Sequence, residues 1–482
     1  MIQFGEWLPD QPDMNNQLVQ ALNVVPIANG YKSINGFSAL SGAASDTILG
    51  IYSAKADDST ANLFAGDSTR LYEFNPATSG LDDISGGTYS LGTNERWRFV
   101  QFGNQIITSG GVGEYLQEYT LGSSTQFATL STDAPKADYI AVVRDFVFTG
   151  NIDEGSGRKP YRVRWSGFND PTSWTSGTNQ SDFQDCVDSG AITGIVGGEY
   201  ATILLEKAIF RATYSGLPLV FQFDKVESQR GCKISGSVCN VGSLVFFYSD
   251  SGFFAFDGQR ATAIGENKVD DFFKEDCDFS YKNLITSSTD PINQLAMWSY
   301  VSNENTTGTP DRLLIFNYNL GRWSLANLNA NLLAPFFTAG YTLEQLDNVS
   351  TSLDTLPASL DSNVWRGGDY FFGGALGSKI YTMTGDPLEA TIETGEIPLA
   401  AGKHNFLSRV YPYYEKGTAS IQVGTRDNMS DDPTFTSLVS PNSDNYANFR
   451  AQGRYHRVRM KMTGEWKSVQ GIDIEAREIG RR

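Results

Sequence analysis

Few residues of this chain could perform nucleophilic or acid-base chemistry. Its 482 residues include two histidines, His404 and His456. His456 lies between Arg454 and Arg457, and neighbouring positive charge disfavours the imidazolium that a Ser-His-Asp triad forms. No GxSxG, HExxH, P-loop or GxGxxG motif occurs in a convincing context. We therefore expect no enzyme activity, no catalytic residue, no metal site and no cofactor.

The four cysteines do not form a disulfide framework or a zinc motif. They are Cys186, Cys232, Cys239 and Cys277, with no CxxC pair and no histidine close by. Such sparse cysteines predict reduced, packed thiols in a protein that folds in a cytoplasm.

Acidic residues are numerous enough for a pair of carboxylates to cleave glycosidic bonds. Residues 166–174 (SGFNDPTSW) superficially resemble the Asp-box turn of sialidases, but the spacing from Ser to Asp differs and the glycine is missing. A tight turn that packs Trp174 against a blade explains this segment better. Asp270-Asp271 and residues 275–278 (EDCD) lack EF-hand spacing, so we expect an exposed acidic helical turn.

The charge distribution sets limits on the partners. The formal net charge is −18, from 37 Lys and Arg against 55 Asp and Glu. This excess of acid excludes tight nucleic-acid binding, although DNA could still slide past. Residues 450–482 differ, because nine basic and four acidic residues give them a local +5 and leave −23 elsewhere. This basic end is either a solvated strand face or a surface that joins copies of the chain.

The first residues, MIQFGEWLPDQPDM, contain neither the basic nor the apolar region of a secretory signal. No segment approaches the roughly 18–20 consecutive apolar residues that a membrane span requires. We expect a protein without a membrane span that is soluble and intracellular when it is made.

A hairpin pattern recurs along the chain and must position any functional residue. Each copy is an apolar strand, a turn rich in Gly, Ser or Asp, and an apolar-aromatic strand. The clearest copies are residues 63–74, 245–256 and 371–383, and looser copies are 106–119, 146–165, 203–214 and 295–318. Consecutive copies start 40 to 57 residues apart, close to the roughly 40–50 residues of a propeller blade, except for a last step of 76. The sequence predicts an all-β protein with a β-propeller body and an insertion or missed blade near the end; ordinary hairpins in another all-β fold are the alternative.

The composition divides the chain into three parts. Residues 1–50 are rich in Pro, Asn and Gly and predict an extended arm, and residues 51–390 hold the propeller. Residues 391–482 contain strand candidates at 409–414, 420–425, 455–462 and 471–476, which predict a smaller sandwich-like sheet. The polar, unpatterned residues 343–361 predict a functional loop or insertion.

Short phrases along the chain occur in a particular order. They are residues 4–10 (FGEWLPD), 21–26 (ALNVVP), 29–31 (NGY), 36–37 (GF), 164–174 (RWSGFNDPTSW), 253–258 (FFAFDG) and 312–324 (RLLIFNYNLGRWS). In this order they resemble the tail hub and nozzle proteins of short-tailed bacteriophages, which include the packaged-DNA stabilisation proteins. The likeness runs to the final Gly480-Arg481-Arg482 and covers essentially the whole chain.

This resemblance implies a structural virion protein that forms a ring of usually six copies below the head-to-tail adaptor. The ring lines the DNA exit channel, and it helps to retain and then release the genome. Each subunit is a propeller with a platform-like domain, which residues 1–50 and 391–482 would build together here. The implied partners are the adaptor, tail fibre or tailspike proteins and distal tail plug proteins, in a virion tail assembled in the host cytoplasm.

The charges fit such a conduit. A channel for a polyanion should attract DNA weakly, because every phosphate paired with Lys or Arg would slow its exit. Rings of identical subunits use heterologous contacts, in which one surface meets a different surface of the neighbour. We expect the acidic body to meet the basic end of the next copy through Arg454, Arg457 and Arg459, which alternate along a predicted strand region.

Two other classes of function remain open from the sequence. A glycan-cleaving propeller would bring two carboxylates together in one pocket and would turn over polysaccharide. A receptor- or glycan-binding propeller would gather exposed aromatic side chains on one face and would bind sugar as a free monomer.

Overall fold

The computed structural model describes residues 1–13, 17–57, 60–92, 94–340, 346, 352, 367–397, 399 and 403–480. Strands make up 52% of the structure and helices 4%, so the all-β prediction is confirmed. The helical elements in the described residues are α1 (Asp270–Asp276) and two 3-10 turns, η1 (Ser235–Ser237) and η2 (Phe279–Leu284).

Seven antiparallel units of four strands, which we number as blades 1–7, form the larger part of the molecule. Blades 1–3 are β6 (Gly50–Lys55), β7 (Ala61–Gly66), β8 (Leu71–Asn75), β9 (Gly80–Asp83); β10 (Arg98–Phe102), β11 (Gln105–Ser109), β12 (Gln117–Thr120), β13 (Ala128–Thr129); and β14 (Lys136–Val143), β15 (Phe146–Asp153), β16 (Arg158–Trp165), β17 (Asp182–Asp185). Blades 4 and 5 are β18 (Ile192–Val196), β19 (Tyr200–Leu205), β20 (Ile209–Tyr214), β21 (Phe221–Glu227); and β22 (Cys239–Val241), β23 (Leu244–Ser249), β24 (Gly252–Phe256), β25 (Ala261–Ala263). Blades 6 and 7 are β26 (Thr286–Asp290), β27 (Leu295–Tyr300), β28 (Arg312–Asn317), β29 (Arg322–Asn327); and β30 (Leu332–Phe337), β31 (Tyr370–Leu376), β32 (Lys379–Thr382), β5 (Ser38–Ala39).

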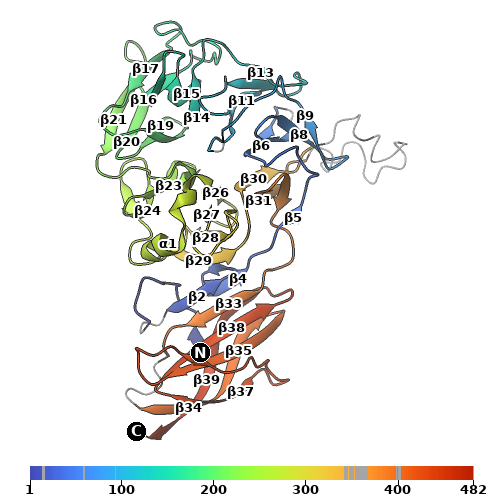
Figure 1. Ribbon diagram of the computed structural model, residues 1–482, viewed down its shortest axis with the longest axis vertical. Coiled ribbons are helices and arrows are strands. Elements are labelled where there is room, and N and C mark those ends of the chain that lie inside the picture. The colour runs from blue at the N-terminus through green and yellow to red at the C-terminus, as the bar shows by residue number, and fades with distance from the viewer. Residues whose placement is uncertain are drawn as a thin grey trace.

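Apolar side chains between the blades close them into a ring. Each pair of neighbouring blades shares a buried cluster, for example Phe64 with Phe127 between blades 1 and 2. The ring closes between its last and first blades, where Phe336 of blade 7 packs with Leu63 and Phe74 of blade 1. The described strands β5–β32 therefore form a seven-bladed β-propeller (Figure 1).

The seven predicted hairpins coincide with the second and third strands of the seven blades, from β7–β8 to β31–β32. The long last step has its cause in blade 7, where residues 338–369 separate the first strand, β30, from the second, β31. The predicted functional loop, residues 343–361, lies outside the described residues apart from Leu346 and Ser352.

The N-terminal arm contributes to both parts of the molecule. Its strand β5 is the outermost strand of blade 7, where Ala39 pairs with Tyr381 and Ser38 pairs with Thr382. The arm as predicted, residues 1–50, therefore does not belong wholly to a platform, because its last strand completes the propeller. A strand from one chain end that completes the last blade joins the ends of the ring without leaving an open edge.

The remaining strands form a second part, which we call the composite unit because both ends of the chain build it. Its strands are β1 (Ile2–Gln3), β2 (Leu18–Leu22), β3 (Val24–Ile27), β4 (Gly30–Ser33), β33 (Ala390–Thr394), β34 (His404–Glu415), β35 (Thr418–Arg426), β36 (Thr434–Phe435), β37 (Ala447–Gly453), β38 (Tyr455–Thr463) and β39 (Ser468–Gly480). One sheet has the order β3-β4-β39-β34-β37 with β1 beside β39, and the other has the order β2-β33-β38-β35-β36. Leu407 and Ile472 of the first sheet share a core with Ile421 and Met460 of the second.

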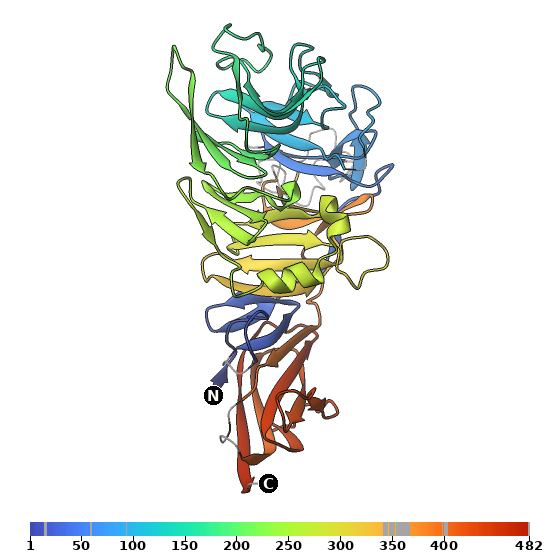
Figure 2. The same ribbon diagram turned by 60° about the vertical axis from the view of Figure 1, so that its left-hand side comes forward.

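The composite unit continues one blade of the propeller. Strand β2 pairs in parallel with β29, the outer strand of blade 6, through Leu22 and Leu325, so one nine-stranded sheet runs through both parts. One apolar cluster also spans the junction, from Phe253 and Trp323 of blades 5 and 6 to Met460 of the composite unit. The molecule is elongated, with the propeller at one end and both chain termini in the composite unit (Figures 1 and 2).

Candidate functional site

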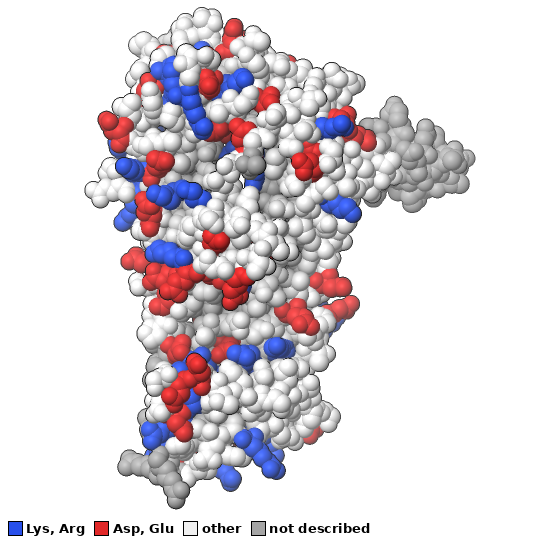
Figure 3. All heavy atoms as spheres, viewed as in Figure 1, with Lys and Arg blue, Asp and Glu red and all other residues white. Residues whose placement is uncertain are grey.

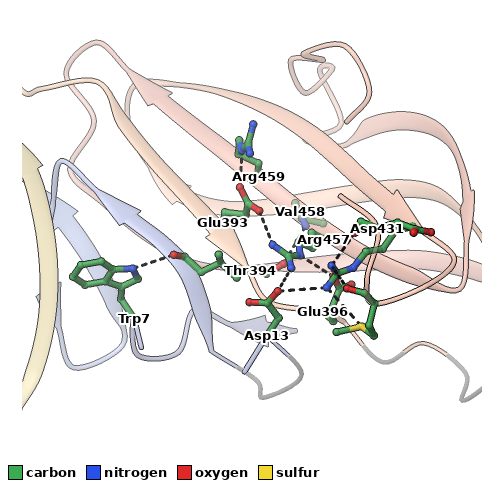
Figure 4. Close-up of polar contacts among 12 residues, drawn as sticks. Trp7, Asp13, Glu393, Thr394, Glu396, Asp431, Arg457, Val458 and Arg459 are labelled. Atoms are coloured by element: carbon green, nitrogen blue, oxygen red, sulfur yellow. Dashed lines mark hydrogen bonds and ion pairs between the residues drawn. The ribbon is translucent and has the colours of Figure 1, made fainter. Parts of the chain in front are cut away.

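A buried group of charged side chains lies where the two chain ends meet in the composite unit. It consists of Asp13, Glu393, Glu396, Arg426, Arg457 and Arg459, and we call it the ion-pair cluster. Figure 4 shows Arg457 between the three acidic residues, with Arg459 directed at Glu393 from the same strand.

Arg457 forms more of these contacts than any other member of the cluster. Its Nε donates to Glu396 Oε1 at 2.8 Å, its Nη1 to Glu393 Oε1 at 3.3 Å, and its Nη2 to Asp13 Oδ2. Arg426 Nη2 lies 2.6 Å from Glu396 Oε1. The N-terminal arm is thereby held to β35 and β38 by charge through Asp13, and to β33 by strand pairing through β2.

Strand alternation explains how the sequence places these groups. In β38, His456, Val458, Met460 and Met462 are buried, and the latter three belong to the apolar core between the two sheets. The intervening Arg457 and Arg459 point to the opposite face. Strand β33 runs antiparallel to β38 with Glu393 opposite Arg459, so a carboxylate lies next to both arginines.

The centre of the cluster is strongly desolvated, whereas Asp13 and Arg459 at its edge are partly exposed. Exposed fractions are 7% for the Arg457 side chain and 4% for that of Glu396. Burial by itself would lower the pKa of Arg457, but the hydrogen bond that Arg457 donates to Glu396 and the charges of Asp13 and Glu396 outweigh it and raise the pKa. A buried charge left without its partner is strongly destabilising, so these contacts fix how the arm docks.

The structure corrects the predicted interface role of Arg457, whereas that of Arg454 stays a prediction. Arg457 cannot meet a neighbouring subunit, because its side chain is buried and paired within its own chain. Arg459 is half-buried, bonded to Glu393, and its guanidinium carbon lies 3.8 Å from the ring centre of Phe435. Arg454 is exposed and precedes β38. Alternation holds for Arg457 and Arg459 within β38 but not for Arg454, which lies before the strand, and it gave no sign that the arm covers this face.

Sequence reasoning missed the acidic half of the cluster. Asp13, Glu393 and Glu396 lie far from Arg457 in sequence, and each looks like an ordinary surface acid on its own. The sequence held one local signal of the cluster: Glu393 and Glu396 belong to the same β-rich segment as Arg457 and Arg459, which alternate with apolar residues.

The two histidines lie on different strands of the composite unit, His404 on β34 and His456 on β38. His456 is fully buried, and neither ring nitrogen has a hydrogen-bond partner among the described residues. Burial lowers its pKa below the usual value. His404 Nδ1 lies 3.6 Å from Asp427 Oδ1 near the surface. In the described part of the chain, no three His, Cys, Asp or Glu side chains are grouped so that they could hold a metal ion.

The four cysteines are free and buried, as predicted. Burial raises the pKa of Cys232 to about 11 and those of Cys186, Cys239 and Cys277 to about 12. Such thiols are protonated and unreactive at neutral pH.

The segment with the superficial Asp-box likeness is a packed turn, as predicted. Trp174 is 1% exposed in the cluster between blades 2 and 3, and its Nε1 donates to the carbonyl of Pro171 at 2.7 Å. Asp170 accepts from Thr172 N within the turn.

The acidic segment at 270–276 is helix α1, but it is not wholly exposed as predicted. Asp270 is 5% exposed and accepts from Phe253 N at 3.0 Å. Burial, followed by the charges of Asp10 and Asp271, raises the pKa of Asp270 to about 6. Asp10 of the arm accepts from the amides of Asp271 and Phe272 at the start of α1. In Figure 3, acidic side chains gather near α1, whereas both signs are mixed over much of the propeller.

Comparisons with known proteins show similarity at the level of solved structures. No family model and no curated protein matches the chain. It is similar to the extracellular domain of a protein described as a one-component system from B. thetaiotaomicron, with 10% identity over 86% of this chain and a TM-score of 0.41. The chain spans about half (48%) of that structure. It is also similar to the Pan2 WD40 domain of Neurospora crassa (6% identity, 73% of this chain, 96% of that chain, TM-score 0.39) and to an exo-β-1,3-galactanase of Phanerochaete chrysosporium (9%, 81%, 97%, 0.27).

No helix among the described residues is both long and apolar enough to cross a membrane.

Proposed function

We propose that this chain is a structural subunit of a viral tail, which forms a ring below the head-to-tail adaptor and lines the channel through which DNA leaves. The observation that carries the proposal is the composite unit. The resemblance of the sequence to tail hub and nozzle proteins implies a platform built from both ends of the chain. Strands β1 and β4 pair with β39, and β2 pairs with β33, in this way.

The continuous sheet suits a part that carries load. A subunit around an outgoing genome must keep its two parts in register while DNA moves past. The pairing of β2 with β29 and the shared core join the propeller to the composite unit, and the ion-pair cluster holds the arm within the composite unit. A ring of such subunits would resist shear between its layers.

The negative net charge supports a conduit for DNA and disfavours a protein that binds DNA tightly. Six copies at −18 each carry a formal −108. Acidic groups on the wall repel phosphate within roughly 8–10 Å at physiological salt, and this repulsion keeps a duplex away from the wall. Adaptor, fibre or tailspike and plug proteins are the partners that this assignment implies, and passage of double-stranded DNA needs no sequence recognition.

A receptor- or glycan-binding propeller is the second candidate, and one observation favours it. Exposed aromatic side chains occur on blade 3, where Phe168 is 42% and Phe183 39% exposed. The guanidinium carbon of Arg162 lies 3.8 Å from the ring centre of Phe183. Such a protein would bind sugar as a monomer, and a glycan array probed with the purified chain would detect this binding.

Imaging separates the two candidates. Electron microscopy of the purified full chain, and of virus particles carrying a tagged copy, should show a closed ring with a central hole on the tail axis. A monomer that binds glycan, or a tag on an appendage off the axis, would overturn the proposal.

A further inference from the structure

Two of the three most exposed large apolar side chains of the described residues lie on one hairpin turn. Leu217 is 74% and Leu219 is 63% exposed, and they flank Pro218 between β20 and β21 of blade 4. The turn is well formed, because Ser215 N donates to the carbonyl of Val220 at 3.0 Å. We call residues 217–219 the apolar tip. Apolar groups held this far into solvent on a structured turn are typical of an interaction surface.

An apolar hollow lies elsewhere on the propeller, between blades 7 and 1. Its volume is about 340 Å³. Its apolar lining includes Leu40, Leu63, Phe74, Pro76, Phe336 and Phe337. A water molecule takes about 30 Å³ in the liquid, so the hollow corresponds to about eleven waters. The side chains of two leucines contain eight carbon atoms, each about the size of a water, and they would fit.

The tip and the hollow lie on opposite sides of the propeller. In a ring of seven blades, blade 4 is three and a half blades from the boundary between blades 7 and 1 in either direction. Figure 1 shows β20 and β21 at the left edge and β30, β31 and β8 toward the right. The tip and the hollow lie on the same face of the propeller. The tip is the turn between the third and fourth strands of blade 4, and the equivalent turn of blade 1 contributes Pro76 and Ser79 to the hollow.

This placement is the one that a ring of identical subunits needs. A heterologous contact joins one surface of a subunit to a different surface of the next, and opposite positions let the contact repeat around a ring. The composite unit extends from blade 6, which lies between the tip and the hollow on one side. Side-by-side subunits joined in this way would therefore direct all composite units to the same end of the ring.

Charged side chains border both surfaces. Next to the tip, Arg144 forms an exposed ion pair with Glu199 (Nε to Oε2, 3.9 Å), and its guanidinium carbon lies 5.3 Å from the ring centre of Tyr214. The hollow is bordered by the exposed Asp369. An exposed ion pair at this distance contributes little, so the Arg144 guanidinium of one copy can also receive the Asp369 carboxylate of the next, which favours this encounter over the reverse arrangement.

We propose that the apolar tip of one copy inserts into the hollow between blades 7 and 1 of the next copy, and that this contact closes the ring. The inference rests on the proposed function, since it names the contact by which that ring forms.

Charge substitution tests the contact in the full-length chain. Leu217→Asp with Leu219→Asp should weaken self-association at least ~10-fold in sedimentation velocity, because charged groups cannot enter an apolar hollow without a partner. The matched control is Ile292→Asp, a 66% exposed residue on blade 6, which should assemble like the wild type. Thermal melting must show that all three proteins are equally folded, as expected for exposed positions. Equal assembly of the tip variant and the wild type would overturn the proposal.

Disulfide trapping tests the direction of the contact. The native thiols are buried, so only introduced cysteines should react. Leu219→Cys and Ser79→Cys, each alone, should give no dimer, and their mixture should give one disulfide-linked dimer. The control pairs Leu219→Cys with Gln259→Cys, which lies on the equivalent turn of blade 5 and should not cross-link. A dimer of Leu219→Cys with itself would show a symmetric contact and overturn the inference.

The outcomes distinguish this contact from the proposed function. Closed rings in electron micrographs without the mixed cross-link would refute the contact and leave the ring intact. A chain that stays monomeric and does not cross-link at any concentration would refute both. Binding of the wild-type monomer to glycans, lost in the tip variant, would assign the tip to a different partner and also overturn the inference.

Discussion

Replacing Arg457 is the most informative single change in the composite unit. Arg457→Met keeps most of the side-chain volume but leaves Asp13, Glu393 and Glu396 without their shared cation. Removing one partner of a buried ion pair costs about 3–5 kcal/mol. Unfolding entropy is about 2.1 cal/mol/K per residue, so cooperative unfolding of the chain has an entropy of about 1 kcal/mol/K. The melting temperature should therefore fall by about 4 °C.

Two further variants show whether the loss arises from unpaired carboxylates. Lys461→Met removes an exposed cation from the same strand and the same face, and should change stability by less than about 0.5 kcal/mol. After Arg457→Met, three carboxylates face only Arg426 and Arg459. Adding Glu396→Gln should restore part of the stability, because it removes the excess negative charge. Calorimetry of the four proteins is the assay. Similar melting temperatures for Arg457→Met and Lys461→Met would refute the reasoning.

Three other predictions concern buried titratable groups. His456 has a folded-state pKa below 6.5, so the unfolded chain binds a proton at this histidine before the folded chain does. The free energy of unfolding should therefore fall as the pH drops below about 6.5. Denaturant titrations from pH 8 to 5.5 should show a smaller fall for His456→Gln than for the wild type. Asp270 has a pKa of about 6 when folded, so its charge destabilises the fold above that pH. Asp270→Asn keeps an acceptor for Phe253 N, and it should raise the free energy of unfolding by about 1–3 kcal/mol at pH 7.5 and by less at pH 5. An unchanged or larger gain at pH 5 would contradict this assignment. A thiol reagent at pH 7.5 should label less than one cysteine per native chain and all four after denaturation, and rapid native labelling would contradict the burial.

The propeller could be predicted from the sequence because its signals are local. Each hairpin carries alternating strands and a turn within a few residues, and all seven predicted hairpins occur as the middle strands of blades. The number of blades was not evident, because the last hairpin follows the insertion. Strand β5, which completes blade 7, has two residues and no sequence pattern of its own. Its formation depends on pairing with the free edge of β32.

The composite unit and its cluster could be predicted less well, for a different reason. Strand alternation gave the face on which Arg457 and Arg459 lie, but not what covers that face. The covering residue Asp13 is 444 positions from Arg457 in sequence. Contacts over such a distance leave no local pattern, so the arginines looked like a free surface.

The pairing of tip and hollow was also invisible in the sequence. Residues 215–220 read only as a turn, and the hollow needs strands of blades 7 and 1 together. Their opposite placement follows from the number of blades, which the structure had to supply.

Electron microscopy of the assembled particle tests the central claim most directly. The account predicts a closed ring of this chain around the tail axis, with an open bore wide enough for duplex DNA, with neighbouring propellers side by side and all composite units at one end. A single copy attached off the axis, or a ring whose bore is filled by the propellers, would contradict it.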